Sequence, residues 1–252
     1  MKLLFVNDDG IDAPGIRALI DAFSGEHTVY VVAPDGQRSA VSKALTLYTP
    51  LRAVPQTIEG AVCAYAVSGT PVDCVRLGLG NLVPEKPDMV ISGINAGPNL
   101  GTDTLYSGTC AGAQEAALLG VPAIAMSLDS FQPDSFETAV EVTRRMLAYA
   151  KAHPLPFGMF YNVNVPDVPL DSIKGYRQTG LALVRYREVY EARTDPIGRP
   201  YYWAPRGRLP GEADADSDDA WVLKGYVTVT PMGYDSARGE SADLTGELGG
   251  ER

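Results

Sequence analysis

Short apolar runs alternate with helix-like segments through the first two thirds of this 252-residue chain. The runs are rich in β-branched residues, as buried strands are, and the segments between them carry apolar residues at helical spacing. The expected strands are residues 3–6, 28–33, 45–48, 62–67, 87–92, 121–127 and 159–165. The expected helices open at Pro14, run through Val75 to Leu79, and cover residues 111–119 and 135–152. This alternation predicts an α/β fold with a doubly wound, mostly parallel sheet flanked by helices.

The last third of the chain has a different character. Residues 174–203 are rich in Tyr, Arg and Val with partial alternation, which predicts a hairpin extending from the core. Residues 212–219 form an acidic run without the Gly and distal Glu of an EF-hand, so we expect a solvated linker. A strand is expected over 225–231. We predict one domain over residues 1–252, with its core in about 1–170 and a hairpin and C-terminal extension in about 171–252.

Composition argues against several functional classes. The formal net charge of −10 disfavours binding to a nucleic-acid polymer, although one local site can still hold a small anion. No signal sequence precedes the first expected strand, and no apolar run approaches the ~18 residues of a membrane span, so we expect a cytoplasmic protein without a membrane partner. Three cysteines and two histidines leave little prospect of a disulfide framework, a histidine-rich zinc site or a Ser-His-Asp triad.

Asp8 and Asp9 stand where the first apolar run stops. Ligands in open α/β sheets bind beyond the carboxyl ends of the strands, and two neighbouring carboxylates there repel each other unless something positive holds them. A hard divalent cation such as Mg²⁺ or Mn²⁺ would do so through oxygen ligands. The alternative is an Asn-Asp-Asp-Gly turn in which an aspartate caps the next helix.

Further polar side chains follow other expected strands and should meet at the same edge of the sheet. Ser39 could add a hydroxyl ligand, Asn95 and Asn99 could add amide oxygens, and residues 107–109 could form an anion site at a helix N-terminus. Each also has an ordinary interpretation, as a loop serine, as turn asparagines and as a helix cap. Carboxylates beside an anion site are typical of metal-assisted phosphoryl transfer.

Other phosphate-handling motifs are absent from the sequence. The position two residues after Asp8 is Gly10 rather than the second Asp of a haloacid-dehalogenase-type site, and Ala116 stands where a cysteine phosphatase built on Cys110 would need Arg. Neither a P-loop nor a Gly-x-Gly-x-x-Gly turn after the first strand is present, which disfavours ordinary NTP hydrolysis and nicotinamide binding.

Taken together, the motifs resemble the SurE (survival protein E) nucleotidase family over roughly residues 1–232. The motifs that carry the resemblance are Asn7-Asp-Asp-Gly10 with Ala13-Pro-Gly15, Val32-Ala-Pro-Asp35 with Arg38-Ser39, Ser68-Gly-Thr-Pro-Val-Asp-Cys-Val75, Ser92-Gly-Ile-Asn95, Tyr106-Ser-Gly-Thr109, Asn162-Val-Asn-Val-Pro166 and Val227-Thr-Val-Thr-Pro231. Ala40 departs from the pattern, since the family usually has Gly after the serine. The tail after Pro231 is also short of apolar residues.

The resemblance implies a divalent-metal-dependent phosphatase acting on nucleoside 5′- and 3′-monophosphates, with short polyphosphate as a further candidate substrate. One Mg²⁺ or Mn²⁺ per subunit is expected, with Co²⁺ as a third candidate. It also implies a Rossmann-like core, an extended hairpin, and a C-terminal segment exchanged between subunits of a homodimer or homotetramer. Carried over by motif position, the metal ligands are Asp8, Asp9, Ser39 and Asn95, and the phosphate-binding residues are Asn99, Ser107, Gly108 and Thr109.

Asp8 and Asp9 are the expected catalytic residues. Asp8 would orient or deprotonate the attacking water, with direct attack by its carboxylate as a less favoured route. A different class of function, a nucleotide- or anion-binding domain without turnover, stays open. The aspartate pair favours catalysis, because a simple anion receptor would not place two negative charges beside its ligand.

Overall fold

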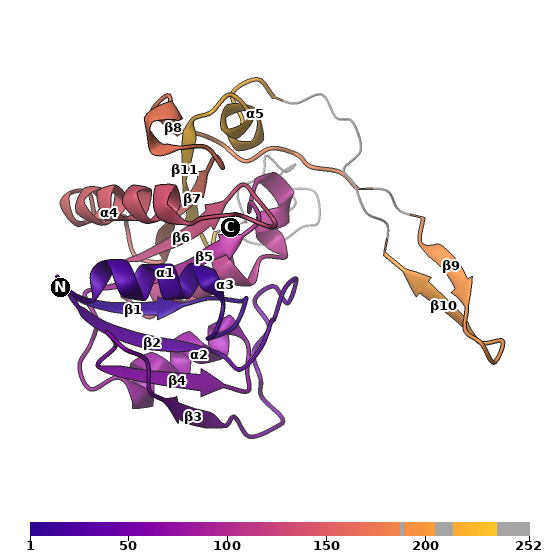
Figure 1. Ribbon diagram of the computed structural model, residues 1–252, viewed down its shortest axis with the longest axis horizontal. Helices are drawn as coiled ribbons and strands as arrows, with labels where there is room; N and C mark the ends of the chain where they lie inside the picture. Colours follow the sequence, from indigo (N-terminus) through magenta and orange to yellow (C-terminus); the bar gives the residue numbers. More distant parts are fainter. Residues whose placement is uncertain (187–188, 205–213, 236–252) are drawn as a thin grey trace, which may run out of the picture.

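The computed structural model describes residues 1–186, 189–204 and 214–235 (Figure 1). Within them a nine-stranded sheet has the order β3-β4-β2-β1-β5-β6-β7-β11-β8. Its strands are β1 (Lys2–Val6), β2 (Thr28–Pro34), β3 (Ala53–Gln56), β4 (Cys63–Val67), β5 (Met89–Ala96), β6 (Ala123–Leu128), β7 (Met159–Val165), β8 (Tyr176–Gln178) and β11 (Val227–Gly233). The central pairs from β4 to β7 are parallel, and β3 and β11 run antiparallel to their neighbours β4 and β7. The expected mostly parallel α/β sheet is confirmed.

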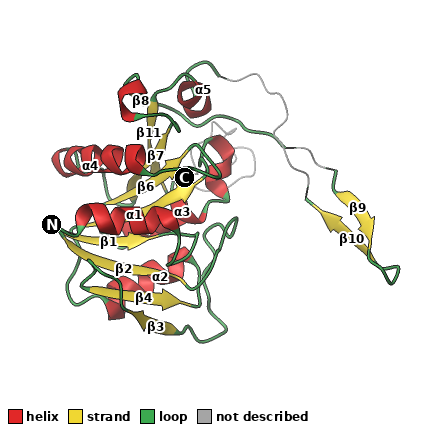
Figure 2. Ribbon diagram, in the orientation of Figure 1, coloured by secondary structure: helices red, strands yellow, loops and turns green. Residues whose placement is uncertain are grey.

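Helices cover both faces of the sheet (Figure 2). They are α1 (Pro14–Phe23), α2 (Pro71–Leu77), α3 (Gly108–Leu118), α4 (Glu137–Ala152) and α5 (Asp218–Leu223), with short helical turns at Gly78–Leu82, Gly101–Leu105 and Leu170–Ser172. The apolar sides of α1 and α4 pack on one face of the sheet, and those of α2 and α3 pack on the other. The strands between these layers are buried on both sides, which explains their continuous apolar runs.

The structure corrects the expected strand at residues 45–48. The Thr46 backbone N–H and hydroxyl both donate to the Asp73 carboxylate, at 3.0 and 2.6 Å, so this backbone bonds to a helix terminus rather than to a strand. Leu47 and Tyr48 are exposed. The edge strand of the sheet is β3, further along the chain.

Two elements near the site extend beyond their expected limits. Strand β5 continues to Ala96 with a register shift after Ser92, so Asn95 belongs to the end of the strand. Helix α3 begins at Gly108, three residues earlier than expected, because the Ser107 side chain caps it by accepting the Cys110 N–H at 3.0 Å.

Residues 174–203 do contain a hairpin, formed by β9 (Glu191–Thr194) and β10 (Pro200–Trp203) in antiparallel pairing. We call β9 and β10 the arm; it projects from the body of the molecule (Figure 1). The first part of the expected hairpin instead contributes β8 to the edge of the main sheet. The tail expected to exchange between subunits lies, from residue 236 onward, outside the described residues.

The expected solvated linker at 212–219 is wrong at its C-terminal end. Asp218 begins α5 and is fully buried, since its carboxylate accepts the backbone N–H groups of Gly101 and Ala182, both at 2.8 Å. Among the described helices, none is long and apolar enough to cross a membrane.

Candidate functional site

Asp8 and Asp9 follow β1 directly and do not play the ordinary turn roles. The turn is closed by Asn7, whose amide donates to the Gly10 carbonyl at 2.7 Å and accepts the Gly10 N–H at 3.2 Å. Helix α1 begins after Ala13 without a side-chain cap. Neither aspartate is therefore needed to close the turn or to cap α1, which leaves both carboxylates for another purpose.

Asp8 lies against the first turn of α3. Its side chain is 4% exposed, and its Oδ1 accepts the Thr109 hydroxyl at 2.6 Å. Burial raises the pKa of Asp8 to about 6, the negative charge of Asp9 adds to the rise, and the hydrogen bond from Thr109 opposes it. The carboxyl end of β1 and the N-terminus of α3 thus meet, as the sequence predicted for two loops 101 residues apart.

Asp9 lies beside the end of β5. Its Oδ2 accepts the Ala96 N–H at 3.4 Å, and burial raises its pKa while this backbone bond lowers it. Neither Asp8 nor Asp9 forms an ion pair in the described part of the chain. The buried carboxylate of Asp8 and the partly buried carboxylate of Asp9 therefore follow each other in the chain, and no described cationic side chain pairs with either.

Ser39 and Asn95 reach the same edge of the sheet, Ser39 on the loop after β2 and Asn95 at the end of β5. The Arg38 N–H donates to the Asp8 carbonyl at 2.6 Å, which holds the loop bearing Ser39 next to the turn after β1. Ser39 itself is exposed and accepts a hydrogen bond from Gln37. The Asn95 amide nitrogen donates to the Gly97 carbonyl at 2.8 Å. Neither side chain forms a described hydrogen bond with Asp8 or Asp9, so the structure brings the loop of Ser39 and the end of β5 to the aspartates without joining these side chains to them.

The N-terminus of α3 is capped by a side chain and lies against Asp8. Ser107 is the N-cap, as the ordinary interpretation predicted, and Gly108 and Thr109 begin the helix. Gly108 lies so close to Asp8 that a Cβ at this position would come within 2.7 Å of the Asp8 Cβ. A side chain at 108 would push Asp8 away, so the close approach requires glycine.

Asn99 is fixed by three side chains that sequence reasoning did not assign to the site. Its backbone N–H donates to Asn164 Oδ1 at 2.7 Å, and its carbonyl accepts the amides of Asn162 and Asn164 at 2.9 and 3.0 Å. Its own amide nitrogen donates to Ser127 at 2.7 Å. Asn162 and Asn164 alternate with valines along β7, and polar residues in a fully buried strand were the signal that could have found them.

Asp218 is a second residue that was missed. By accepting N–H groups from Gly101 and Ala182 it joins the loop after β5 to the segment that leads to the arm. The Thr102 hydroxyl reinforces this junction by donating to the Val184 carbonyl at 2.7 Å. The acidic run around Asp218 gave no sign that one of its members is buried.

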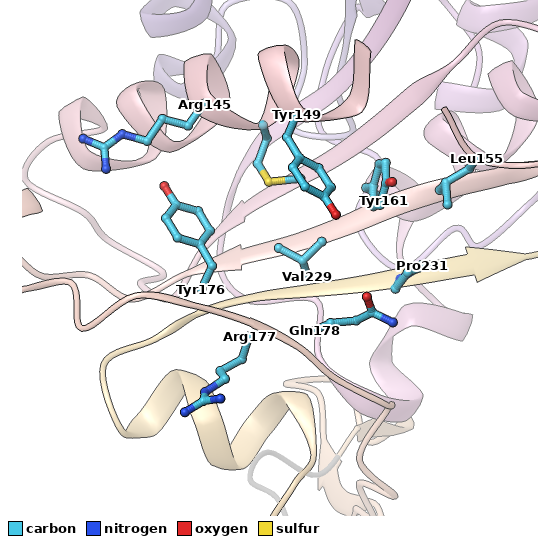
Figure 3. Close-up of a pocket in the computed structure, with 10 residues that line it drawn as sticks. Arg145, Tyr149, Leu155, Tyr161, Tyr176, Arg177, Gln178, Val229 and Pro231 are labelled. Atoms are coloured by element: carbon cyan, nitrogen blue, oxygen red, sulfur yellow. The ribbon is translucent and has the colours of Figure 1, made fainter. Parts of the chain in front are cut away.

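The side chains at this edge offer mainly oxygen atoms as ligands for a cation. No group of three or more His, Cys, Asp and Glu side chains gathers anywhere among the described residues, so any cation here would bind two carboxylates supplemented by neutral oxygens. A cavity of about 500 Å³ lies elsewhere, between α4 and strands β7, β11 and β8 (Figure 3). Its lining, which includes Tyr149, Tyr176 and Val229, takes no residue from the loops described above.

Carboxylates and a helix N-terminus attract ions of opposite charge. The carboxylates attract a cation, and the free N–H groups of the first helical turn attract an anion. Here the two lie in contact through Asp8, Gly108 and Thr109. The arrangement can hold a cation and a phosphate side by side, as metal-assisted phosphoryl transfer requires.

Comparison with known proteins agrees with this arrangement. The sequence model of the family described as "Survival protein SurE" matches residues 3–188. A protein named 5'-nucleotidase SurE from Desulfatibacillum aliphaticivorans is 45% identical over 236 residues, covering 93% of both chains. A protein of the same name from Synechococcus sp. (strain JA-3-3Ab) is 46% identical over 236 residues, covering 92% of this chain and 91% of its own.

A solved structure is also similar. The crystal structure of the Sure protein from Aquifex aeolicus matches with a TM-score of 0.79 and 39% identity over 94% of each chain. The family model, the near-full-length relatives and the shared architecture lead to the same conclusion: this chain belongs to the SurE family.

Proposed function

We propose that this chain is a divalent-metal-dependent phosphomonoesterase that hydrolyses nucleoside 5′-monophosphates to nucleoside and phosphate. Nucleoside 3′-monophosphates and short polyphosphate are further candidate substrates. The observation that carries the proposal is the contact of Asp8 with Gly108 and Thr109, which sets one carboxylate of an adjacent aspartate pair against a helix N-terminus, with no ion pair to it among the described residues. The relatives named 5'-nucleotidase SurE support the choice of substrate.

The residues present fit a hard divalent cation. Asp8 and Asp9 have raised pKa values because burial disfavours their charge, and no ion pair among the described residues offsets it. An all-oxygen set of Asp8, Asp9, Ser39 and Asn95 suits Mg²⁺ or Mn²⁺, and Co²⁺ is a third candidate. When bound, such a cation supplies positive charge that offsets the charge of the phosphoryl group and makes water more acidic.

The remaining chemistry falls to the chain itself. The N–H groups at the start of α3 would hold the phosphate oxygens, with Ser107, Gly108 and Thr109 as the binding segment. Asn99, held by its three polar neighbours, keeps the loop between β5 and α3 in place.

Asp8 is ionised at neutral pH and is positioned by Thr109, so it can orient water and accept its proton. Direct attack by the Asp8 carboxylate is the alternative route. A homodimer or homotetramer stays a prediction from the family resemblance.

Phosphate release from AMP, with and without EDTA, tests the proposal. We expect release with added Mg²⁺ or Mn²⁺ and its loss in EDTA. Asp9→Asn should abolish turnover with the circular dichroism spectrum unchanged, while the matched variant Asp12→Asn, at an exposed aspartate after the same strand, should stay active. Tight AMP retention without phosphate release, indifferent to EDTA, would instead identify a binding domain and refute the proposal.

A further inference from the structure

The nucleoside of a bound substrate has to extend from the phosphate site toward solvent. Thr109 is fully buried, Ser107 and Asn99 are nearly so, and Gly108 is closed off by Asp8. The inner side of the helix terminus is therefore filled by protein. A nucleoside attached to a phosphate bound there can extend only across the outer rim.

The rim next to the phosphate site consists of two loops bonded to each other. The Ser42 N–H donates to the Tyr106 carbonyl at 2.9 Å, and the Ser42 hydroxyl donates to the Leu105 carbonyl at 2.7 Å. The first loop also carries Ser39, and the second runs directly into Ser107. Residues 105 and 106 thus lie against the loop that carries Ser39 and directly precede the phosphate-binding segment in the chain.

This part of the rim is apolar and faces water. The side chains of Leu105 and Tyr106 are each 61% exposed, although the backbone beneath them is fixed by Ser42. Among the described residues, Tyr106 has no aromatic or cationic partner over its ring. A held backbone with an exposed, unstacked ring one residue from a phosphate site suits a planar ligand that carries a phosphate.

We propose that Tyr106, assisted by Leu105, stacks on the nucleobase and makes the enzyme prefer nucleotides over other phosphomonoesters. The assignment rests on the proposed nucleotidase function. The helix terminus and the aspartate pair recognise a phosphoryl group of any origin, so they cannot distinguish AMP from a sugar phosphate. An aromatic ring on the rim can make this distinction, because every base offers a flat face for stacking and ribose phosphate offers none.

The test compares AMP with ribose 5-phosphate, which has the same sugar and phosphate without the base. In Tyr106→Ala we expect the KM for AMP to rise about tenfold, as the loss of one base–aromatic stack predicts. The KM for ribose 5-phosphate, or its inhibition constant against AMP hydrolysis where its own turnover is slow, should stay unchanged. Tyr106→Phe keeps the ring and should behave as the unaltered enzyme.

A matched control separates stacking from the general effect of deleting an exposed ring. Tyr202→Ala removes a tyrosine of similar exposure, 63%, from the arm, and should change neither constant. An unchanged KM for AMP in Tyr106→Ala, or an equal rise for both phosphates, would overturn the assignment. Absence of phosphate release from AMP by the unaltered enzyme with added Mg²⁺ or Mn²⁺ would refute the proposed function itself, which is a different result.

Discussion

The Thr109 hydroxyl donates a hydrogen bond of 2.6 Å to Oδ1 of Asp8 and so ties the carboxyl end of β1 to the first turn of α3. This bond lowers the pKa of Asp8, against the larger effect of burial, which raises it. Asp8 must be ionised to bind a cation or to accept a proton. The strength of this one bond therefore influences the lowest pH at which the site works.

Thr109→Val removes the bond and should raise the pKa of Asp8 above its value of about 6. A hydrogen bond to a charged group contributes about 1.5–3 kcal/mol, so the acid limb of kcat/KM should move up by about one to two pH units. AMP hydrolysis measured from pH 5 to 9 checks this, and Thr109→Ser, which keeps the hydroxyl, is the control. An acid limb at the same pH in Thr109→Val would show that the bond does not control Asp8.

Asn164 on β7 holds the loop that carries Asn99. Asn164→Leu keeps the size of the side chain but leaves the buried Asn99 N–H without its acceptor, at a cost of about 1–3 kcal/mol. We expect the melting temperature to fall by roughly 5 °C. The KM for AMP should rise as well, because Asn99 lies in the loop between β5 and the phosphate site.

Asn81→Leu is the matched control. Asn81 is exposed in the helical turn Gly78–Leu82 that follows α2, and no described hydrogen bond uses its side chain. It should leave both the melting temperature and the KM unchanged. A loss of stability in Asn164→Leu with no change in KM would limit the asparagine cluster to a purely structural role.

Ala40 adopts a backbone conformation that suits glycine. Its φ is +57°, in the left-handed region, where a residue with a Cβ is strained. A left-handed conformation costs a residue with a Cβ roughly 1–2 kcal/mol, and glycine loses part of that advantage through its freer unfolded chain. Ala40→Gly should therefore stabilise the protein by up to about 1 kcal/mol.

Urea unfolding of Ala40→Gly and of Ala44→Gly measures the effect. Ala44 is exposed in the same loop and does not have a positive φ, so glycine there should destabilise slightly. If both variants lost stability equally, Ala40 would not be strained.

The sequence predicted the sheet, and the edge at which its polar loops meet, because both follow from local patterns. Buried parallel strands appear in the sequence as apolar runs. The residues that follow these strands, such as Asp8 and Ser107, lie at one edge of the sheet because the strands are parallel. The strand predicted from the apolar run at 45–48 was wrong because of a contact that the local sequence pattern does not reveal. Thr46 bonds to Asp73, and that carboxylate is brought there by the start of α2.

The buried polar residues could not be predicted in this way. Asp218 is buried because two N–H groups, one of them 117 residues away, meet at its carboxylate. Nothing in the surrounding acidic run distinguishes it from its exposed neighbours. Likewise, the asparagines of β7 bond to a loop 63 to 65 residues earlier in the chain, which only the folded topology brings near.

Keeping Asp8 charged in its buried position costs stability. Without metal its pKa is about 6 in the folded protein, against 3.8 for an ordinary aspartate. The folded protein therefore holds the proton more tightly than the unfolded chain, and stability falls as pH rises from about 4 to about 6 and stays lower above that. The rise in pKa corresponds to about 3 kcal/mol of stability lost at neutral pH.

Asp8→Asn removes this charge while its amide oxygen can still accept the Thr109 hydroxyl. At pH 7.5 in EDTA we expect the free energy of unfolding to rise by about 2–3 kcal/mol, and below about pH 3 the difference should vanish because Asp8 is then protonated in both the folded and the unfolded chain. Phosphate release from AMP should be abolished. Asp12→Asn, at an exposed aspartate, should show neither effect. A variant less stable than the unaltered protein in EDTA at pH 7.5 would mean that the Asp8 charge is stabilised by the fold, and the reason for expecting a cation between the two aspartates would be lost.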